Sequence, residues 1–193
     1  MAYTPKILAF AGSLRAESWN KKLVKIAING AKAAGANVTY IDLRDFPLPV
    51  FDEDLEKADG LHPNARKLKD LFLANDGLLI SCPEYNSSIT AALKNAIDWV
   101  SRPVPGESAL QCFDGKVVSL MAASPGALGG LRGLVTVRSI LGNIKCIVLP
   151  DQVAVPKVHE VMNPDGTLKD AKVQSSIEAL GANVAKVVAK LKS

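Results

Sequence analysis

The sequence holds 193 residues, of which 48% are hydrophobic and 22% are charged, and this suits one globular domain with a sizeable core. No apolar run approaches the roughly 18 to 20 residues of a membrane span, and no secretory signal is recognisable, so no membrane association is expected. The net charge of +4 is spread along the chain, which argues against nucleic-acid binding and favours anionic small molecules. The three cysteines form no C-x-x-C pair, so a cytoplasmic location is expected.

Apolar residues alternate along the chain between short continuous runs and longer stretches of helical periodicity. The short runs predict five strands buried on both faces, over Lys6–Ala11, Val38–Asp42, Gly77–Cys82, Lys116–Ala123 and Ile144–Leu149. Helical spacing predicts five helices, roughly over Asn20–Ala34, His62–Ala74, Thr90–Ser101, Leu128–Leu141 and Lys169–Lys192. Alternating strands and helices imply parallel βαβ units, so the sequence predicts a single doubly wound α/β domain over residues 1–193.

The loop after the first predicted strand, AGSLRAESWN (residues 11–20), is rich in donors and contains a single acid. In doubly wound sheets, ligands bind beyond the carboxyl ends of the strands. Hydroxyl, guanidinium and amide donors beside a helix start suit a phosphate monoester, and they come from Ser13, Arg15, Ser18 and Asn20. Taken alone, the loop equally allows Ser18 to be a simple helix cap and Arg15 a solvated side chain. The loop matches neither the G-x-G-x-x-G pattern nor the P-loop pattern.

The loop after the third predicted strand begins CPEYNSSIT (residues 82–90). It places an aromatic ring beside a row of donors, which suits a flat heterocycle, although a subunit contact and a plain turn are alternatives. Cys82 follows a strand as a phosphatase nucleophile does, but that chemistry needs an arginine where Ser88 stands. We therefore expect Cys82 to be a small buried hydrophobe, and Trp99 to belong to the core.

The loop after the fourth predicted strand, ASPGALGGLRG (residues 123–133), is rich in glycine. Glycines allow a backbone to approach a ligand closely, with Ser124 as a donor, and a flexible turn is the alternative. His62 and His159 lack the spacing of a metal site, so both are expected to be ordinary surface residues.

Taken together, these loops resemble the NAD(P)H-dependent FMN reductase family, which includes chromate and quinone reductases and azoreductase-like enzymes. The matching stretches are GSLRAESWN, PEYNSSITAALKNAIDW, IDLRDFPLPVFDEDLE and SPGALGGLR, and the resemblance covers nearly the whole chain. It implies a flavodoxin-like, five-stranded parallel sheet of strand order 2-1-3-4-5. It also implies FMN bound without a covalent link, and NADPH or NADH as the hydride donor.

The resemblance also assigns site residues. It places the FMN phosphate in the first loop, at Ser13, the Leu14 backbone, Arg15, Ser18 and Asn20. It lines the isoalloxazine, largely through backbone groups, with Pro83, Glu84, Tyr85, Asn86 and Ser87. The other side of the ring would be bordered by Ser124, with Pro125, Gly126 and Gly129 close by. Arg102 and Arg132 could serve an anionic substrate or a subunit interface, and the interface is the preferred interpretation.

The predicted function is two-electron reduction of quinones, chromate or similar small oxidants at the expense of NAD(P)H. The sequence shows no catalytic triad and no metal-ligand spacing, so no catalytic side chain is predicted and the chemistry is left to the cofactor. NAD(P)H would pass a hydride to flavin N5 and leave before the oxidant binds, which is a ping-pong scheme. The alternatives are an FMN-binding electron carrier without NAD(P)H-linked activity, although such carriers are typically acidic, and a scaffold without flavin. The oxidant and the preference between NADPH and NADH stay open.

The segment DFPLPVFDED (residues 45–54) carries four large apolar residues, Phe46, Leu48, Val50 and Phe51. Two prolines exclude a regular helix or central strand, so the segment is expected to run extended over the surface. We expect about half of these side chains to fold back on the chain's own helices. The remainder, with Tyr85, would form a two-fold contact, which predicts a homodimer or homotetramer with the flavin near the interface.

Overall fold

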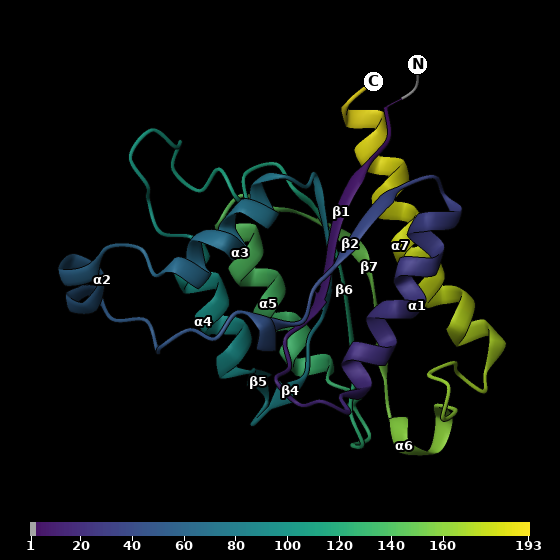
Figure 1. Ribbon diagram of the computed structural model, residues 1–193. Helices are drawn as coiled ribbons and strands as arrows, with labels where there is room; N and C mark the ends of the chain where they lie inside the picture. Colours follow the sequence, from purple (N-terminus) through teal and green to yellow (C-terminus); the bar gives the residue numbers. More distant parts are fainter. Residues whose placement is uncertain (1–2) are drawn as a thin grey trace.

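Five parallel strands form one sheet in the order β2-β1-β3-β6-β7 in the computed structural model, which describes residues 3–193 (Figure 1). The strands are β1 (Lys6–Ala11), β2 (Asn37–Tyr40), β3 (Gly77–Ser81), β6 (Val117–Ala123) and β7 (Ile147–Val155). Since β6 and β7 are the fourth and fifth strands of this sheet along the chain, the predicted order 2-1-3-4-5 is confirmed.

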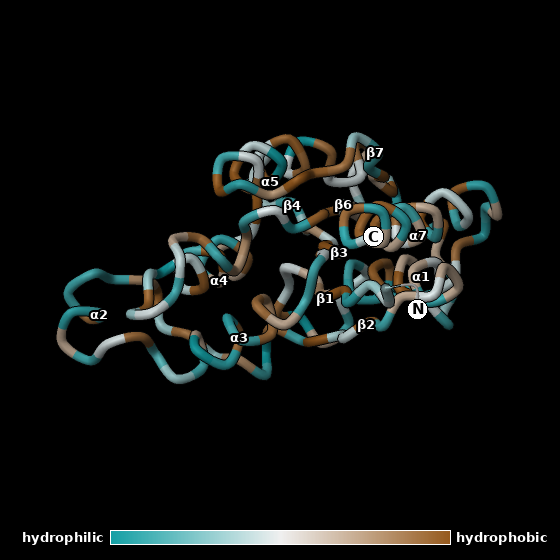
Figure 2. The backbone as a smooth tube through the Cα atoms, turned by 90° about the horizontal axis from the view of Figure 1, so that it is seen from above, coloured by the Kyte–Doolittle hydropathy of each residue, from teal (hydrophilic) through white to brown (hydrophobic). Residues whose placement is uncertain are grey.

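Helices cover both faces of the sheet. Seen from above in Figure 2, α1 (Trp19–Ala33) and α7 (Ala171–Leu191) lie on one side of the strands. The other side carries α3 (Pro63–Leu73), α4 (Ala91–Val100) and α5 (Leu131–Asn143). Because successive strand residues point to opposite faces, Ile7 and Ala9 join the core beneath α1 and α7, whereas Leu8 and Phe10 join the core beneath the other three helices. The doubly wound arrangement is therefore confirmed.

Helices α1 and α7 touch backbone to backbone at two glycines. A Cβ atom added to Gly30 of α1 would lie 1.9 Å from the carbonyl oxygen of Glu178. One added to Gly181 of α7 would lie 1.8 Å from the carbonyl oxygen of Ala27. No side chain fits in either place, so these glycines set the distance between the two helices.

The edge strand β7 is longer than the sequence predicts. Its predicted end was Leu149, whereas the strand continues to Val155. Residues 149–151 together face Ser119 of β6, because the register between the two strands shifts there. Arg138 on α5 holds this bulge by donating to Oε1 of Gln152 at 3.0 Å. The proline in the segment therefore marks a bulge within a strand, not the end of one.

Four short elements and one projecting helix were not predicted. They are the 3-10 turn η1 (Leu43–Asp45), the helices α2 (Glu53–Asp59) and α6 (Val158–Val161), and the strands β4 (Glu84–Tyr85) and β5 (Ser88–Ile89). The two strands form a separate antiparallel hairpin. Helix α2 has no buried residue and projects from the rest of the molecule (Figure 1, left).

The segment between η1 and α2 runs extended over α4, as predicted. Phe46 and Leu48 pack against the core, and the ring of Phe51 lies edge-on to that of Trp99, with centroids 5.1 Å apart. Trp99 is fully buried and its indole N–H donates to the Pro49 carbonyl at 2.8 Å. Val50, which is 84% exposed, is the one large apolar side chain of the segment left open. No helix within residues 3–193 is both long and apolar enough to cross a membrane.

Candidate functional site

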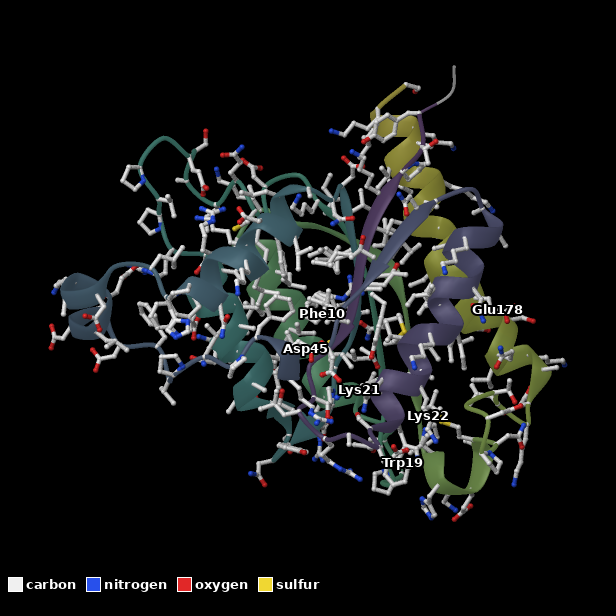
Figure 3. All side chains as sticks on the ribbon, viewed as in Figure 1. Phe10, Trp19, Lys21, Lys22, Asp45 and Glu178 are labelled. Carbon is white, nitrogen blue, oxygen red and sulfur yellow. The ribbon has the colours of Figure 1, made fainter. Side chains whose placement is uncertain are left out.

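The three loops singled out by the sequence meet at the carboxyl ends of β1, β3 and β6, at the lower edge of the sheet in Figure 1. They surround a hollow of about 230 Å³, which we call the loop hollow. Its lining residues are Ser13, Arg15, Ser18, Trp19, Asn20, Pro83, Glu84, Tyr85, Ala123, Ser124 and Pro125. Nine of these were predicted, and Trp19, which was not, begins α1 at this edge (Figure 3).

The first loop leaves several donors unused. Ser18 is the N-cap residue of α1, as the alternative interpretation expects, but its hydroxyl makes no capping hydrogen bond and so is available to a ligand. Within residues 3–193, the backbone N–H groups of Ser18, Trp19 and Asn20 have no acceptor. The Arg15 guanidinium has no acidic partner there either, and it lies over the Trp19 ring, 5.5 Å from its centroid. With no acid in the first turn of α1, this corner suits an anion.

The Asn20 side chain makes hydrogen bonds within the chain, whereas the prediction gave it to the FMN phosphate. Its Nδ2 donates to the carbonyl of Ala123 at 2.9 Å. Its Oδ1 accepts from the Ala123 backbone N–H at 3.0 Å and from the Ser81 hydroxyl at 2.8 Å. Asn20 therefore ties the ends of β3 and β6 to the start of α1, and its side chain holds the loops together instead of pointing into the loop hollow as a free donor.

The second loop folds into the β4–β5 hairpin. Asn86 and Ser87 form its tip with φ of 52° and 66°, so both adopt the left-handed conformation of a type I′ turn. Both are exposed and lie outside the loop hollow, while Tyr85 lines it and is 54% exposed. The Glu84 carboxylate, 10% exposed, accepts from the Gly133 N–H at 3.0 Å and pairs with Arg132 at 3.1 Å. This contact fixes the hairpin to the start of α5.

Most glycines of the third loop serve packing. A Cβ atom on Gly129 would lie 2.6 Å from the Val155 backbone, and one on Gly130 would lie 2.8 Å from the Cβ of Ala122. Gly129 thus packs closely against β7 and does not line the loop hollow, and its place beside a ligand stays a prediction. A Cβ atom on Gly126 would make only an ordinary contact, 3.6 Å from the Ser124 Oγ, and the Gly126 N–H donates to that hydroxyl at 3.2 Å.

A second hollow, of about 390 Å³, adjoins the first, and we call it the central hollow. Leu14, which is 56% exposed, lines it instead of the loop hollow. Thr90 stands between α4 and the first loop, where its hydroxyl donates to the Gly12 carbonyl at 2.6 Å and accepts from the Leu93 N–H at 3.2 Å. Thr90 was not predicted as a site residue, although a threonine directly before a helical run is recognisable as a helix cap.

The chain matches the family model of NADPH-dependent FMN reductases over residues 5–160. It belongs to this family. An NAD(P)H-dependent FMN reductase of Pseudomonas aeruginosa is 33% identical over 174 residues, which cover 90% of this chain and 89% of that protein. A quinone reductase of Pseudomonas putida is 33% identical over 153 residues, 78% of each chain. A solved NAD(P)H:(acceptor) oxidoreductase from Paracoccus denitrificans gives a TM-score of 0.77 at 26% identity, covering 97% of this chain and 98% of its own.

Membership of the FMN reductase family confirms the flavodoxin-like fold and an enzyme that uses FMN with NAD(P)H as the hydride donor. The loop hollow fits that cofactor. A phosphate monoester needs several donors at once, and the unpaired Arg15 and free backbone N–H groups supply them. The ring system needs flat and partly apolar walls, and Pro83, Tyr85 and Pro125 line the same hollow.

No side chain of this FMN reductase is placed for nucleophilic or metal chemistry within residues 3–193. The three cysteines are buried and unpaired, and burial raises the pKa of Cys82 strongly and that of Cys112 to about 11. The interpretation of Cys82 as a buried hydrophobe is therefore confirmed. No cluster of metal-ligating side chains occurs in this range. His159 is exposed as predicted, whereas half-buried His62 caps α3 by accepting from the Asn64 N–H at 3.2 Å.

The two arginines whose roles stayed open have partners within the chain. The Arg102 Nε lies 2.9 Å from the Glu56 carboxylate, and its guanidinium lies over the Phe51 ring, 4.9 Å from the centroid. It therefore anchors the base of α2. Arg132 is engaged by Glu84 at the hairpin. Both arginines stabilise elements beside the site through intrachain contacts, and their role at a subunit interface stays a prediction.

Proposed function

We propose that this FMN reductase carries out two-electron reduction of quinones, with chromate and similar small oxidants as further acceptors. The observation that carries the proposal is the loop hollow, where the unpaired Arg15 and three free backbone N–H groups face an anion site beside Tyr85. A relative at 33% identity bears the name quinone reductase. The net charge of +4 favours anionic oxidants such as chromate.

We assign the FMN phosphate to the first loop, and the assignment differs between side chains. Arg15 would supply the charge, and Ser13 and Ser18 would supply hydroxyl groups. Asn20 would contribute through its backbone N–H, because its amide is engaged elsewhere. Leu14 would contribute through its backbone, while the residue itself lines the adjoining central hollow.

We assign the isoalloxazine to the hairpin and the third loop. The walls on one side would be Pro83, Glu84 and Tyr85, with Asn86 and Ser87 at the hairpin tip. The other side would be bordered by Ser124, Pro125 and Gly126, of which Gly126 alone lacks a side chain. Backbone N–H groups here would stabilise negative charge on the ring system.

Bound FMN supplies the redox chemistry, accepting a hydride from NAD(P)H and returning two electrons to the oxidant. The residues of the protein bind and orient the cofactor and the substrates, and they exclude water from the site. The one carboxylate that lines the loop hollow, Glu84, is held by Arg132 and Gly133, so it is not poised to move a proton. Because donor and oxidant would both reach the cofactor beside Tyr85, they would bind in turn.

The proposal is tested by adding NADPH without oxygen to the purified protein loaded with FMN. We expect the yellow absorbance to bleach and a quinone to restore it. An electron carrier without NAD(P)H-linked activity would stay yellow, and that outcome would refute the proposal. Initial rates should then give parallel double-reciprocal lines. Intersecting lines would contradict alternate use of one site while leaving the reductase activity intact.

We also propose a homodimer or homotetramer in the cytoplasm. An exposed apolar stripe leads into and along α5, with Leu128, Leu131 and Val135 exposed by 48%, 43% and 62%. It adjoins the hairpin that carries Tyr85, because Glu84 contacts the start of α5. Exposed apolar stripes of this kind favour a two-fold contact. This stripe replaces residues 45–54 as the proposed interface, since most of that segment's apolar side chains pack on their own chain.

A further inference from the structure

A continuous series of hollows leads from the loop hollow along α4. The central hollow shares Ser13, Arg15 and Tyr85 with the loop hollow. It shares Leu14 and Ala92 with a third hollow of about 320 Å³, which we call the Arg44 hollow. A ligand that starts at the loop hollow can therefore extend past Leu14 into the Arg44 hollow without leaving the surface of one chain.

The walls of the Arg44 hollow are mostly apolar. They are formed by Leu14 of the first loop and by apolar side chains of η1, the segment that follows it, α3 and α4, among them Leu43, Phe46, Leu48 and Leu68. Two polar side chains complete the lining, Asn95 and Arg44. The Asn95 amide already donates to the Pro49 carbonyl and accepts from the Phe51 N–H, both at 2.8 Å. Arg44 is thus the polar group available to a ligand, and its neighbour Asp45 marks the place in Figure 3.

The Arg44 guanidinium has no hydrogen-bond or ion-pair partner among the residues that the structure describes. The chain has six arginines, and within residues 3–193 four of them hold acceptors, namely Arg66, Arg102, Arg132 and Arg138. The two whose side chains have no hydrogen-bond or ion-pair partner in this range are Arg15 and Arg44. The carboxylate of nearby Asp42 is already taken by Lys21 at 2.6 Å. The two free guanidinium groups therefore lie at the two ends of one series of hollows.

A fourth hollow along α4, of about 410 Å³, is the competing place for a ligand. It also shares Leu14 and Ala92 with the central hollow. Its cation is Lys94, whose ammonium pairs with both carboxylate oxygens of Asp98 at 2.7 and 2.8 Å. That charge is neutralised, so the Arg44 hollow is the better match for an anionic group.

We propose that the Arg44 hollow receives the adenosine end of NADPH and that Arg44 binds its 2′-phosphate, an inference that rests on the proposed reductase function. The adenine ring suits apolar walls, and a guanidinium suits a phosphomonoester because it can donate two parallel hydrogen bonds. NADH carries a hydroxyl group at that position. Arg44 is thereby the residue that makes the enzyme prefer NADPH, a preference the sequence left open.

The test measures binding of two adenosine fragments to the FMN-loaded protein by calorimetry. The probes are 2′,5′-ADP, which carries the 2′-phosphate, and 5′-AMP, which lacks it. We expect the wild type to bind 2′,5′-ADP about 10- to 100-fold more tightly, the scale of a charge-assisted hydrogen-bonded pair. Arg44→Ala should abolish that preference. Lys67→Ala removes an exposed positive charge from α3 that lines none of these hollows, and should retain it.

Two outcomes overturn the inference: equal affinity of the wild type for both fragments, or an unchanged preference in Arg44→Ala. Flavin reduction gives a second readout, in which Arg44→Ala should weaken NADPH binding about 10- to 100-fold and leave NADH unaffected. If neither dinucleotide bleaches the flavin, the proposed function fails. If NADPH and NADH bleach the flavin of the wild type equally well, the proposed reductase function is supported and the assignment of Arg44 to the 2′-phosphate is wrong.

Discussion

At the scale of single residues, Arg15 is distinguished by the lack of a polar partner for its side chain within residues 3–193. We expect Arg15→Ala to weaken FMN binding by about 1.5–3 kcal/mol, the worth of a hydrogen bond to a charged group. Riboflavin, which lacks the phosphate, should bind nearly as well as before. Titration of both ligands, followed by flavin fluorescence, measures the difference. An equal loss for both would assign Arg15 to the ring system or to the Trp19 contact instead.

Glu84 should behave in the opposite way, because it holds the hairpin and not the phosphate. Glu84→Ala leaves the Gly133 N–H and Arg132 without their acceptor. We therefore expect the binding free energies of FMN and riboflavin to weaken equally, by about 1–3 kcal/mol. Glu84→Gln keeps one acceptor oxygen and should restore most of the affinity. A changed visible spectrum of the bound flavin would accompany the loss. If Glu84→Ala left both affinities and the spectrum unchanged, the positioning role would be wrong.

The sequence identified most of the residues around the loop hollow but not their partners. Asn20 was predicted from its amide donors, yet those donors reach Ala123, 103 positions along the chain. The same holds for Glu84, whose acceptor oxygens serve Gly133, 49 positions away. These pairings depend on how the three loops meet in the folded chain, and the residues next to each partner in the sequence give no signal of that arrangement. The close packing of Gly129 against β7 could not be predicted for the same reason.

At the scale of elements, the contact between α1 and α7 depends on glycine. Gly181→Ala would place a methyl group 1.8 Å from the Ala27 carbonyl oxygen, so the helices must separate. We expect this change to lower the free energy of unfolding by about 1–3 kcal/mol or more, measured by urea denaturation. The matched control is Gly142→Ala in α5, where an added Cβ atom would meet no other part of the fold within 4 Å. This change should raise the free energy of unfolding by about 0.5–1 kcal/mol. Equal effects of the two changes would contradict the close helix contact.

The long helices and the three central strands that the sequence predicted have a buried face, whereas the edge strands β2 and β7, expected to be buried on both faces, are mostly exposed or half-buried. β1 was predicted to the residue, and the five long helices were located within about three residues at each end, because a buried face leaves a hydrophobic period. Helix α2 has no buried residue and therefore no such period. Its remaining signals are local, Asp52 accepting from the Asp54 N–H at the start and Gly60 at the end. The continuation of β7 was missed because the proline at position 150 is also a signal of a strand end.

At the scale of the whole molecule, the exposed stripe on α5 is the surface through which we propose that copies of the chain associate. We expect Val135→Glu to split the oligomer and to reduce turnover, because the stripe adjoins the hairpin at the loop hollow. Val50→Glu makes the same change at a side chain that is 84% exposed on the extended segment, and it should leave the assembly intact. Light scattering at micromolar concentration measures both. A wild type that is monomeric and fully active would refute the assembly, and a monomeric Val135→Glu protein with full turnover would show that one chain completes the site.

The bulge of β7 limits what such assemblies can become. A flat edge strand can pair with the edge strand of another copy and so extend the sheet. Each added copy exposes a further edge strand, so this kind of assembly is open-ended. Here residues 149–151 interrupt the ladder at one edge, held by Arg138, and the strand at the other edge, β2, is four residues long. Copies that cannot join by their sheets must join by their helices, where a two-fold contact closes on itself. We therefore expect the bulge that concealed the end of β7 in the sequence to disfavour edge-to-edge growth of the sheet at high protein concentration.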